Sequence, residues 1–107
     1  MPQADGLESL RRRIEGLDDR IVDLLAERFA LLHEVAAYKH PRGIPVVIPE
    51  RIDAVIERAA ARGQRHGLDP GMLRDIYRRL VDEACRTEAR AMDELPRGLA
   101  PAAATHD

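Results

Sequence analysis

Four cationic side chains and one acidic side chain of this sequence lie on or beside predicted apolar helical faces, and the cations could bind a small anion. They are Arg11, Arg28, Lys39, Arg51 and Glu88. Burying a guanidinium or ammonium group is unfavourable unless an anion meets it, so each buried cation predicts a negative partner. That partner is either a carboxylate of the protein or an anionic ligand, and the residues alone leave both alternatives open.

Arg28 and Lys39 are the leading candidates because of their place in a repeating apolar pattern. Arg28 interrupts a heptad seam whose other members are Leu7, Ile14, Ile21 and Val35 at one position and Leu10, Leu17, Leu24, Leu31 and Tyr38 at the other. Lys39 is the only lysine among 17 basic residues. It follows Arg28 by eleven residues, which is three helical turns and about 16 Å. The two long side chains can therefore converge on a small dianion.

The seam predicts one continuous helix over residues 7–39, with Asp5 as its N-cap. Such a helix is about 48 Å long, whereas a compact domain of this chain length has a radius of gyration of about 13 Å. A second copy must cover the seam, so we expect a symmetric homodimer. In an antiparallel dimer Arg11 of the partner subunit lies near Arg28, which predicts two equivalent sites that each use both chains.

Two shorter helices are expected after a proline-containing loop over residues 40–48. The second helix has Pro49 at its first position, runs to about residue 66, and stops at Gly67. The third helix is capped by Asp69 and ends before Pro96. The loop is of the kind that closes over a binding site.

The third helix presents an apolar stripe that ends in a charge. The stripe consists of Leu73, Ile76, Tyr77, Leu80, Val81, Ala84 and Cys85. Glu88 takes the next place on this stripe and therefore points into the interior. It serves either a ligand or, in the simpler alternative, an arginine of another helix.

Composition favours an all-α protein with three helices in one domain. Hydrophobic residues make up 45% of the 107 residues but aromatic residues only 3%, so the core is aliphatic, which suits helices. The formal net charge of −2, with both signs interleaved, argues against nucleic acid as a partner. The expected organisation is a flexible lead over residues 1–6, a helical domain over residues 7–95 and a disordered tail over residues 96–107.

Several functional classes are excluded by what the sequence lacks. The four histidines lack ligand spacing with one another or with Cys85, so we expect no metal, and no phosphate loop or dinucleotide turn suggests a cofactor. No apolar run has membrane length, and the N-terminus lacks a signal-peptide pattern. A single cysteine excludes an internal disulfide and suits a reducing compartment, so we expect a cytoplasmic protein. Because no apolar run has membrane length, we expect no membrane partner.

With these features the sequence resembles the all-helical chorismate mutase family from about Leu7 to Met92. The resemblance rests on Leu10-Arg11, Leu17-Asp18, residues 24–28, Val35 with Lys39, Pro45, Arg51, residues 67–69 and Glu88. It implies three helices per chain interlocked in a homodimer. It also implies an isomerase of the shikimate pathway and aromatic amino acid biosynthesis. The reaction is the [3,3] Claisen rearrangement of chorismate to prephenate, which needs neither nucleophile nor cofactor.

The resemblance also implies roles for individual residues. Arg28, Lys39 and Arg11 of the partner subunit hold the two carboxylates and the ether oxygen of the substrate. Glu88 takes the place of a Gln or Glu that hydrogen-bonds the ether oxygen, and it can donate only while protonated. Arg51 matches a family arginine at the start of the second helix. Further substrate-binding positions implied by the resemblance are Val35, Ile48, Ile52, Ala84 and Cys85.

Three alternatives to this function stay open. Ile52 stands where many family members have a carboxylate for the ring hydroxyl, and residues 43–51 and 85–88 look similar to mutases of 4-amino-4-deoxychorismate in antibiotic pathways. The Pro49-Glu50-Arg51 start of the second helix is similar to isochorismate pyruvate lyases of the same fold. The third alternative is a helical dimer with a regulatory or scaffolding role.

Overall fold

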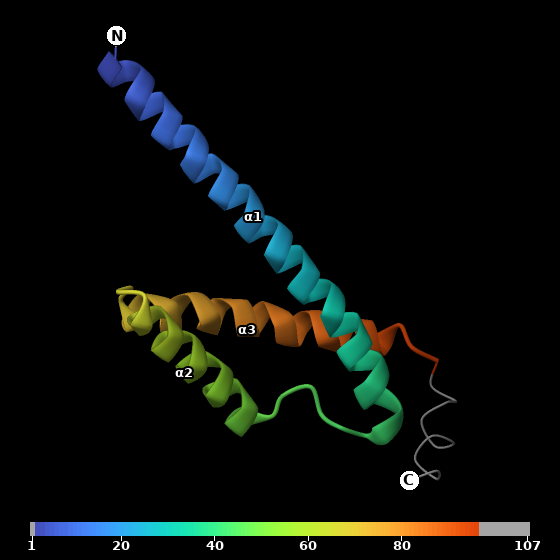
Figure 1. Cartoon of the computed structure of the whole chain (residues 1–107). Helices are drawn as coiled ribbons and strands as arrows, with labels where there is room; N and C mark the ends of the chain where they lie inside the picture. The colour runs from blue at the N-terminus through green and yellow to red at the C-terminus, as the bar shows by residue number, and fades with distance from the viewer. Residues whose placement is uncertain (1, 97–107) are drawn as a thin grey trace. The chain divides into compact units, whose positions relative to one another are not determined.

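The computed structural model describes residues 2–96, with side chains from Gly6 onward, and consists of helices joined by short turns (Figure 1). The elements are α1 (Pro2–Lys39), the 3₁₀ turn η1 (His40–Arg42), α2 (Pro49–Arg65) and α3 (Pro70–Asp93). Within the described residues there is no strand, which confirms the all-α architecture with three α-helices. No helix in this part of the chain is both long and apolar enough to cross a membrane.

The start of α1 differs from the expected one. The helix begins at Pro2 rather than at Leu7, so Asp5 lies inside it and not at the N-cap. Proline is well suited to a first helical turn because that turn needs no backbone N–H donor. Met1 and residues 97–107, which include most of the predicted tail, lie outside the described residues.

The chain forms two compact units, one up to Leu31 and one from Leu32 onward. The first unit is a single helical segment, and the Leu and Ile side chains of its seam are 49–60% exposed. Such a helix gains little stability from its own chain, because most helical stability in proteins comes from packing an apolar face. Large exposed apolar patches are typical of surfaces that bind other proteins, membranes or ligands.

In the second unit α2 and α3 pack against each other through small side chains. Its buried apolar residues are Ala36, Ile56, Ala60, Val81, Ala84 and Ala91. Gly63 of α2 is also buried, and a Cβ added there would lie 2.7 Å from Cγ of Leu73 on α3. The two helices therefore approach each other closely because this position has no side chain.

The ends of α2 and α3 confirm the boundaries predicted from sequence to within a few residues. Pro49 and Pro70 lie in the first turns of α2 and α3, and the Asp69 side chain accepts a 2.9 Å hydrogen bond from the Met72 backbone N–H. After α2 ends at Arg65, Gly67 adopts a positive φ of 78°, a conformation that favours glycine. These signals act within a few residues, so they are visible in the sequence.

Gly63 gives a prediction for the packing of α2 on α3. Gly63→Ala should destabilise the protein by about 1–2 kcal/mol. The steric cost of the new methyl group against Leu73 should exceed the gain in helix propensity from replacing glycine by alanine. Urea unfolding at fixed protein concentration measures this change. In a Leu73→Ala background the same substitution should cost clearly less, and equal costs in both backgrounds would show that the close approach is not the cause.

Candidate functional site

A buried ion pair joins the end of α1 to the C-terminal part of α3 in the second unit. Nζ of Lys39 lies 2.8 Å from Oε1 of Glu88, and the two side chains are only 15% and 9% exposed. Nζ of Lys39 also donates a 3.3 Å hydrogen bond to the backbone carbonyl of Val46. The structure thus brings together two of the three residues that the sequence nominates as catalytic.

Local structure explains how these groups meet. Lys39 is the last residue of α1, and its carbonyl accepts a 3.2 Å hydrogen bond from the backbone N–H of Ile44. Gly43 closes η1 in the left-handed region with a φ of 67°. This tight turn reverses the direction of the chain. The backbone carbonyl of Val46, seven residues after Lys39, therefore lies next to the Lys39 side chain.

The Lys39–Glu88 contact leaves hydrogen-bonding capacity unused. Oε1 of Glu88 is buried and close to Nζ of Lys39, but the approach is not aligned as a hydrogen bond, so the contact is ionic. An ammonium group has three N–H donors, and only the one to Val46 is well directed here. A buried ammonium with a free donor beside a carboxyl group can bind an anionic oxygen and a hydrogen-bond acceptor together.

Two neighbours of Glu88 on α3 are also candidate site residues. Ala84, one turn earlier, is buried, and Cys85 is half-buried. Burial raises the pKa of the Cys85 thiol, the negative charges of Glu88 and Asp82 raise it further, and Lys39 partly opposes them. Cys85 therefore stays a neutral thiol near neutral pH and contributes a small apolar surface rather than a nucleophile.

Three candidate residues cluster in the first turn of α2. The carbonyl of Ile48, the N-cap residue, accepts hydrogen bonds from the backbone N–H groups of Arg51 at 2.9 Å and Ile52 at 3.1 Å. Ile48 and Ile52 are half-buried, whereas the Arg51 side chain is exposed. Val35, on α1, is also exposed. Of these four side chains only that of Arg51 can form hydrogen bonds, and it has no partner among the described residues.

The two remaining candidates lie in the first unit. Arg28 is half-buried, and its Nη1 is fully buried without a hydrogen-bond partner. Among residues 6–96 no carboxylate of the chain pairs with it, so the alternative of an internal acidic partner is not observed there. Arg11 is exposed and pairs with Glu8 at 2.9 Å on the same helix. Exposed pairs of this kind contribute little stability and break readily, so Arg11 stays available to a ligand.

The sequence did not predict the Val46 carbonyl as part of the site, and it suggested a different partner for Glu88. The Val46 carbonyl has no side-chain signature, so nothing in the sequence points to it. For Glu88 the simpler alternative was an arginine of another helix, and the structure supplies Lys39 instead. Among the described residues, no three His, Cys, Asp or Glu side chains lie close enough to hold a metal ion.

The described residues thus form an all-α chain that buries a lysine–glutamate pair and part of an unpaired arginine. The chain is a member of the chorismate mutase family: residues 10–89 match the family described as chorismate mutase type II. Membership in this family makes the protein an isomerase.

The curated relatives include mutases with different substrates in their names. A 4-amino-4-deoxychorismate mutase of Streptomyces venezuelae is 34% identical, over 86% of this chain and 89% of its own. Another, from Streptomyces pristinaespiralis, is 33% identical over 78% of this chain, and the alignment spans 65% of that protein's length. A chorismate mutase of Methanocaldococcus jannaschii is 28% identical over 82% of this chain and 89% of its own.

Proposed function

We propose that this protein converts chorismate to prephenate by an intramolecular [3,3] rearrangement. The observation that carries the proposal is the buried Lys39–Glu88 pair, because it combines a cation and a carboxyl group with unused hydrogen-bonding capacity. The reaction is unimolecular and passes through a transition state in which the ether oxygen gains negative charge. It requires a folded substrate conformation and donors at that oxygen, and it requires no nucleophile.

The proposal gives each charged residue a separate task. Lys39 donates to the ether oxygen and to a neighbouring carboxylate, and Glu88 donates to the ether oxygen when it is protonated. Arg28 binds a substrate carboxylate, which supplies the acceptor that its buried Nη1 lacks in the free chain. Arg51 and Arg11 of the partner subunit add further positive charge around the dianion. Removal from water strengthens all of these interactions relative to those in solution.

The direct test is incubation of the purified protein with chorismate, its 4-amino-4-deoxy analogue and isochorismate, each followed by product separation and mass spectrometry. We expect prephenate from chorismate at a rate well above the uncatalysed one. Release of pyruvate from isochorismate alone would instead assign lyase activity. If none of the three substrates is converted, the proposed function is wrong.

The 4-amino-4-deoxy analogue is the second candidate substrate. Two relatives named for it are 34% and 33% identical to this chain, over 86% and 78% of its length. One relative named chorismate mutase is 28% identical over 82% of the chain, and one named secreted chorismate mutase is 32% identical over 64% of it. The candidate positions Ile48, Ile52 and Ala84 are apolar and so offer no carboxylate to either ring substituent. The ratio of kcat/KM for the two substrates decides between them, and an amino preference above about tenfold would reassign the protein.

We also propose that the functional unit is a homodimer with shared sites. The exposed seam of α1 supports a second copy as its cover, because an unburied stripe of this length destabilises a lone helix in water. Arg11→Ala and Arg28→Ala variants, each inactive alone, should regain part of the activity when mixed, since half of the sites in heterodimers are then intact. Persistent inactivity after proven subunit exchange would contradict shared sites.

A cytoplasmic setting is part of the same proposal. Its support is the single cysteine, which gives the chain no internal disulfide and suits a reducing compartment. Fractionation of the producing cells, followed by immunodetection, tests it, and recovery of the protein from the culture medium would overturn it.

A further inference from the structure

The exposed face of α2 carries a row of arginines. Arg51, Arg58, Arg62 and Arg65 follow one another at spacings of seven, four and three residues, and all four are exposed. At about 100° per residue, these spacings place the four Cα positions within roughly 60° of one another around the helix axis. The row extends about 21 Å along the axis from Arg51 to Arg65.

The four arginines in the row lack acidic partners among residues 6–96. The acidic residues of α2 are Glu50, Asp53 and Glu57, and their positions lie roughly 90° to 150° around the helix from the middle of the row. Glu57 is moreover occupied by Arg74 of α3 at 3.0 Å. The row therefore presents four positive charges that no carboxylate of the described chain offsets.

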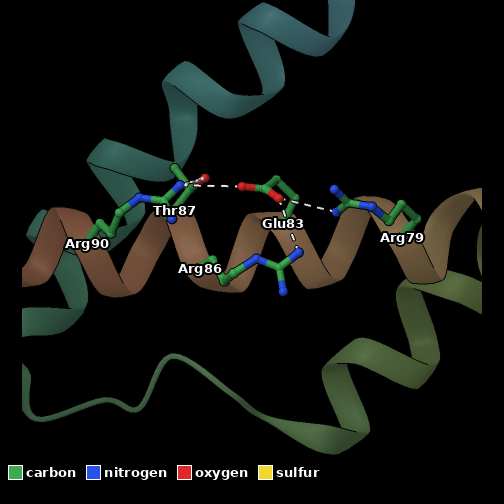
Figure 2. A network of polar contacts seen from close by, with 5 residues as sticks. All are labelled: Arg79, Glu83, Arg86, Thr87 and Arg90. Atoms are coloured by element: carbon green, nitrogen blue, oxygen red, sulfur yellow. Dashed lines mark hydrogen bonds and ion pairs between the residues drawn. The ribbon is translucent and has the colours of Figure 1, made fainter.

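The arginines of α3 show the opposite arrangement. Arg79, Arg86 and Arg90 all reach the carboxylate of Glu83, at 3.2, 3.1 and 3.4 Å, and Arg90 also contacts Thr87 (Figure 2). The three guanidinium groups hold the pKa of Glu83 below its usual value, which keeps it charged. On α3 three arginines share Glu83 as counterion, and Arg74 and Arg78 pair with Glu57 and Asp75. The arginines of the row on α2 have no such partner among the described residues.

Helix stability does not explain the whole row. Arg62 and Arg65 lie in the last turn of α2, where a cation interacts favourably with the helix dipole. Arg51 lies in the first turn, where the same dipole is unfavourable for a cation, and Arg58 lies mid-helix. An explanation of the row must therefore also account for Arg51 at its N-terminal end, which is a candidate substrate-binding residue.

We propose that Arg58, Arg62 and Arg65 form an electrostatic track that raises the local concentration of the dianionic substrate at the site beginning with Arg51. This inference rests on the proposed function. The three arginines lie about 10, 16 and 21 Å along the axis from Arg51, close enough to act on a double charge at low ionic strength. Aligned charges of one sign on an exposed face increase capture of an oppositely charged substrate.

The test is the ionic-strength dependence of the Arg58→Gln, Arg62→Gln, Arg65→Gln triple variant. At about 0.01 M ionic strength, where the Debye length is about 30 Å, KM for the substrate should rise about three- to fivefold. At about 0.3 M the change should fall below about twofold, because the charges are screened. The kcat value should stay within about 1.5-fold of wild type, since none of the three residues contacts the reacting atoms.

A charge-conserving variant supplies the matched control. Replacing the same three arginines by lysine keeps the charge and changes the guanidinium groups, so KM and its salt dependence should match wild type. A dicarboxylate competitive inhibitor should lose more affinity for the glutamine variant than its monocarboxylate analogue does. Circular dichroism of each variant verifies that the fold is unchanged.

The outcomes separate the two proposals. A wild-type protein that converts none of the three candidate substrates overturns both the function and the track. Full wild-type activity combined with the same salt dependence of KM in the glutamine variant overturns the track alone. A KM increase that persists unchanged at high salt, or that the lysine variant shares, also overturns it, because such an effect is not electrostatic.

Discussion

Lys39→Ala should lower kcat/KM by about 10²–10³-fold, mostly through kcat. The ammonium group is proposed to donate to the ether oxygen, and an interaction that strengthens as charge develops contributes to the transition state more than to substrate binding. No other lysine exists in the chain to replace it. Steady-state kinetics followed by the loss of chorismate absorbance measures the effect, and a change below about twofold in both kcat and KM would remove Lys39 from the site.

A loss of stability must be separated from this loss of activity. Lys39→Ala leaves Glu88 buried without its cation, and breaking a buried pair from one side destabilises proteins by about 3–5 kcal/mol. The double variant Lys39→Met with Glu88→Gln leaves no unpaired buried charge, so much of the lost stability should return. Activity should not return with it. Recovery of activity in the double variant would show that Lys39 acts only through folding.

Glu88→Gln should change the pH dependence of the reaction rather than abolish it. In the free protein the Glu88 carboxylate lies against Lys39, and in that form it accepts hydrogen bonds but cannot donate to an ether oxygen. Activity of the wild type should therefore be lower at alkaline than at acidic pH, because only a protonated carboxyl group can donate. The glutamine amide donates at every pH, so the variant should show a flat profile over the same range.

The pH profiles of the wild type and of Glu88→Gln should differ in a defined direction. At the acidic end of the profile the two proteins should have similar kcat values, and at the alkaline end the variant should be faster, by about tenfold or more. Glu88→Ala serves as the control, because it removes both the charge and the donor and should be slow throughout. Superimposable profiles for wild type and Glu88→Gln would show that protonation of Glu88 plays no part.

The helices and their ends follow from signals that act over short distances. Asp69 accepts from the Met72 backbone, Pro49 and Pro70 occupy first turns, and Gly67 takes the positive φ after α2. Each of these is a property of a few consecutive residues, so the sequence alone predicts it. The start of α1 at Pro2 was the exception, because a helix continues past a weak cap when nothing stops it.

The sequence by itself determined the three helices, the apolar seam of α1 and the unusual presence of charge at Arg28, Lys39 and Glu88, because periodicity and residue type are local properties. Only the tertiary structure decided that Lys39 meets Glu88 at 2.8 Å and donates to the Val46 carbonyl. A contact between the end of α1 and the C-terminal part of α3 depends on how the turn after Lys39 directs the chain. Those distances arise from packing between segments far apart in sequence, and no single stretch of residues encodes them.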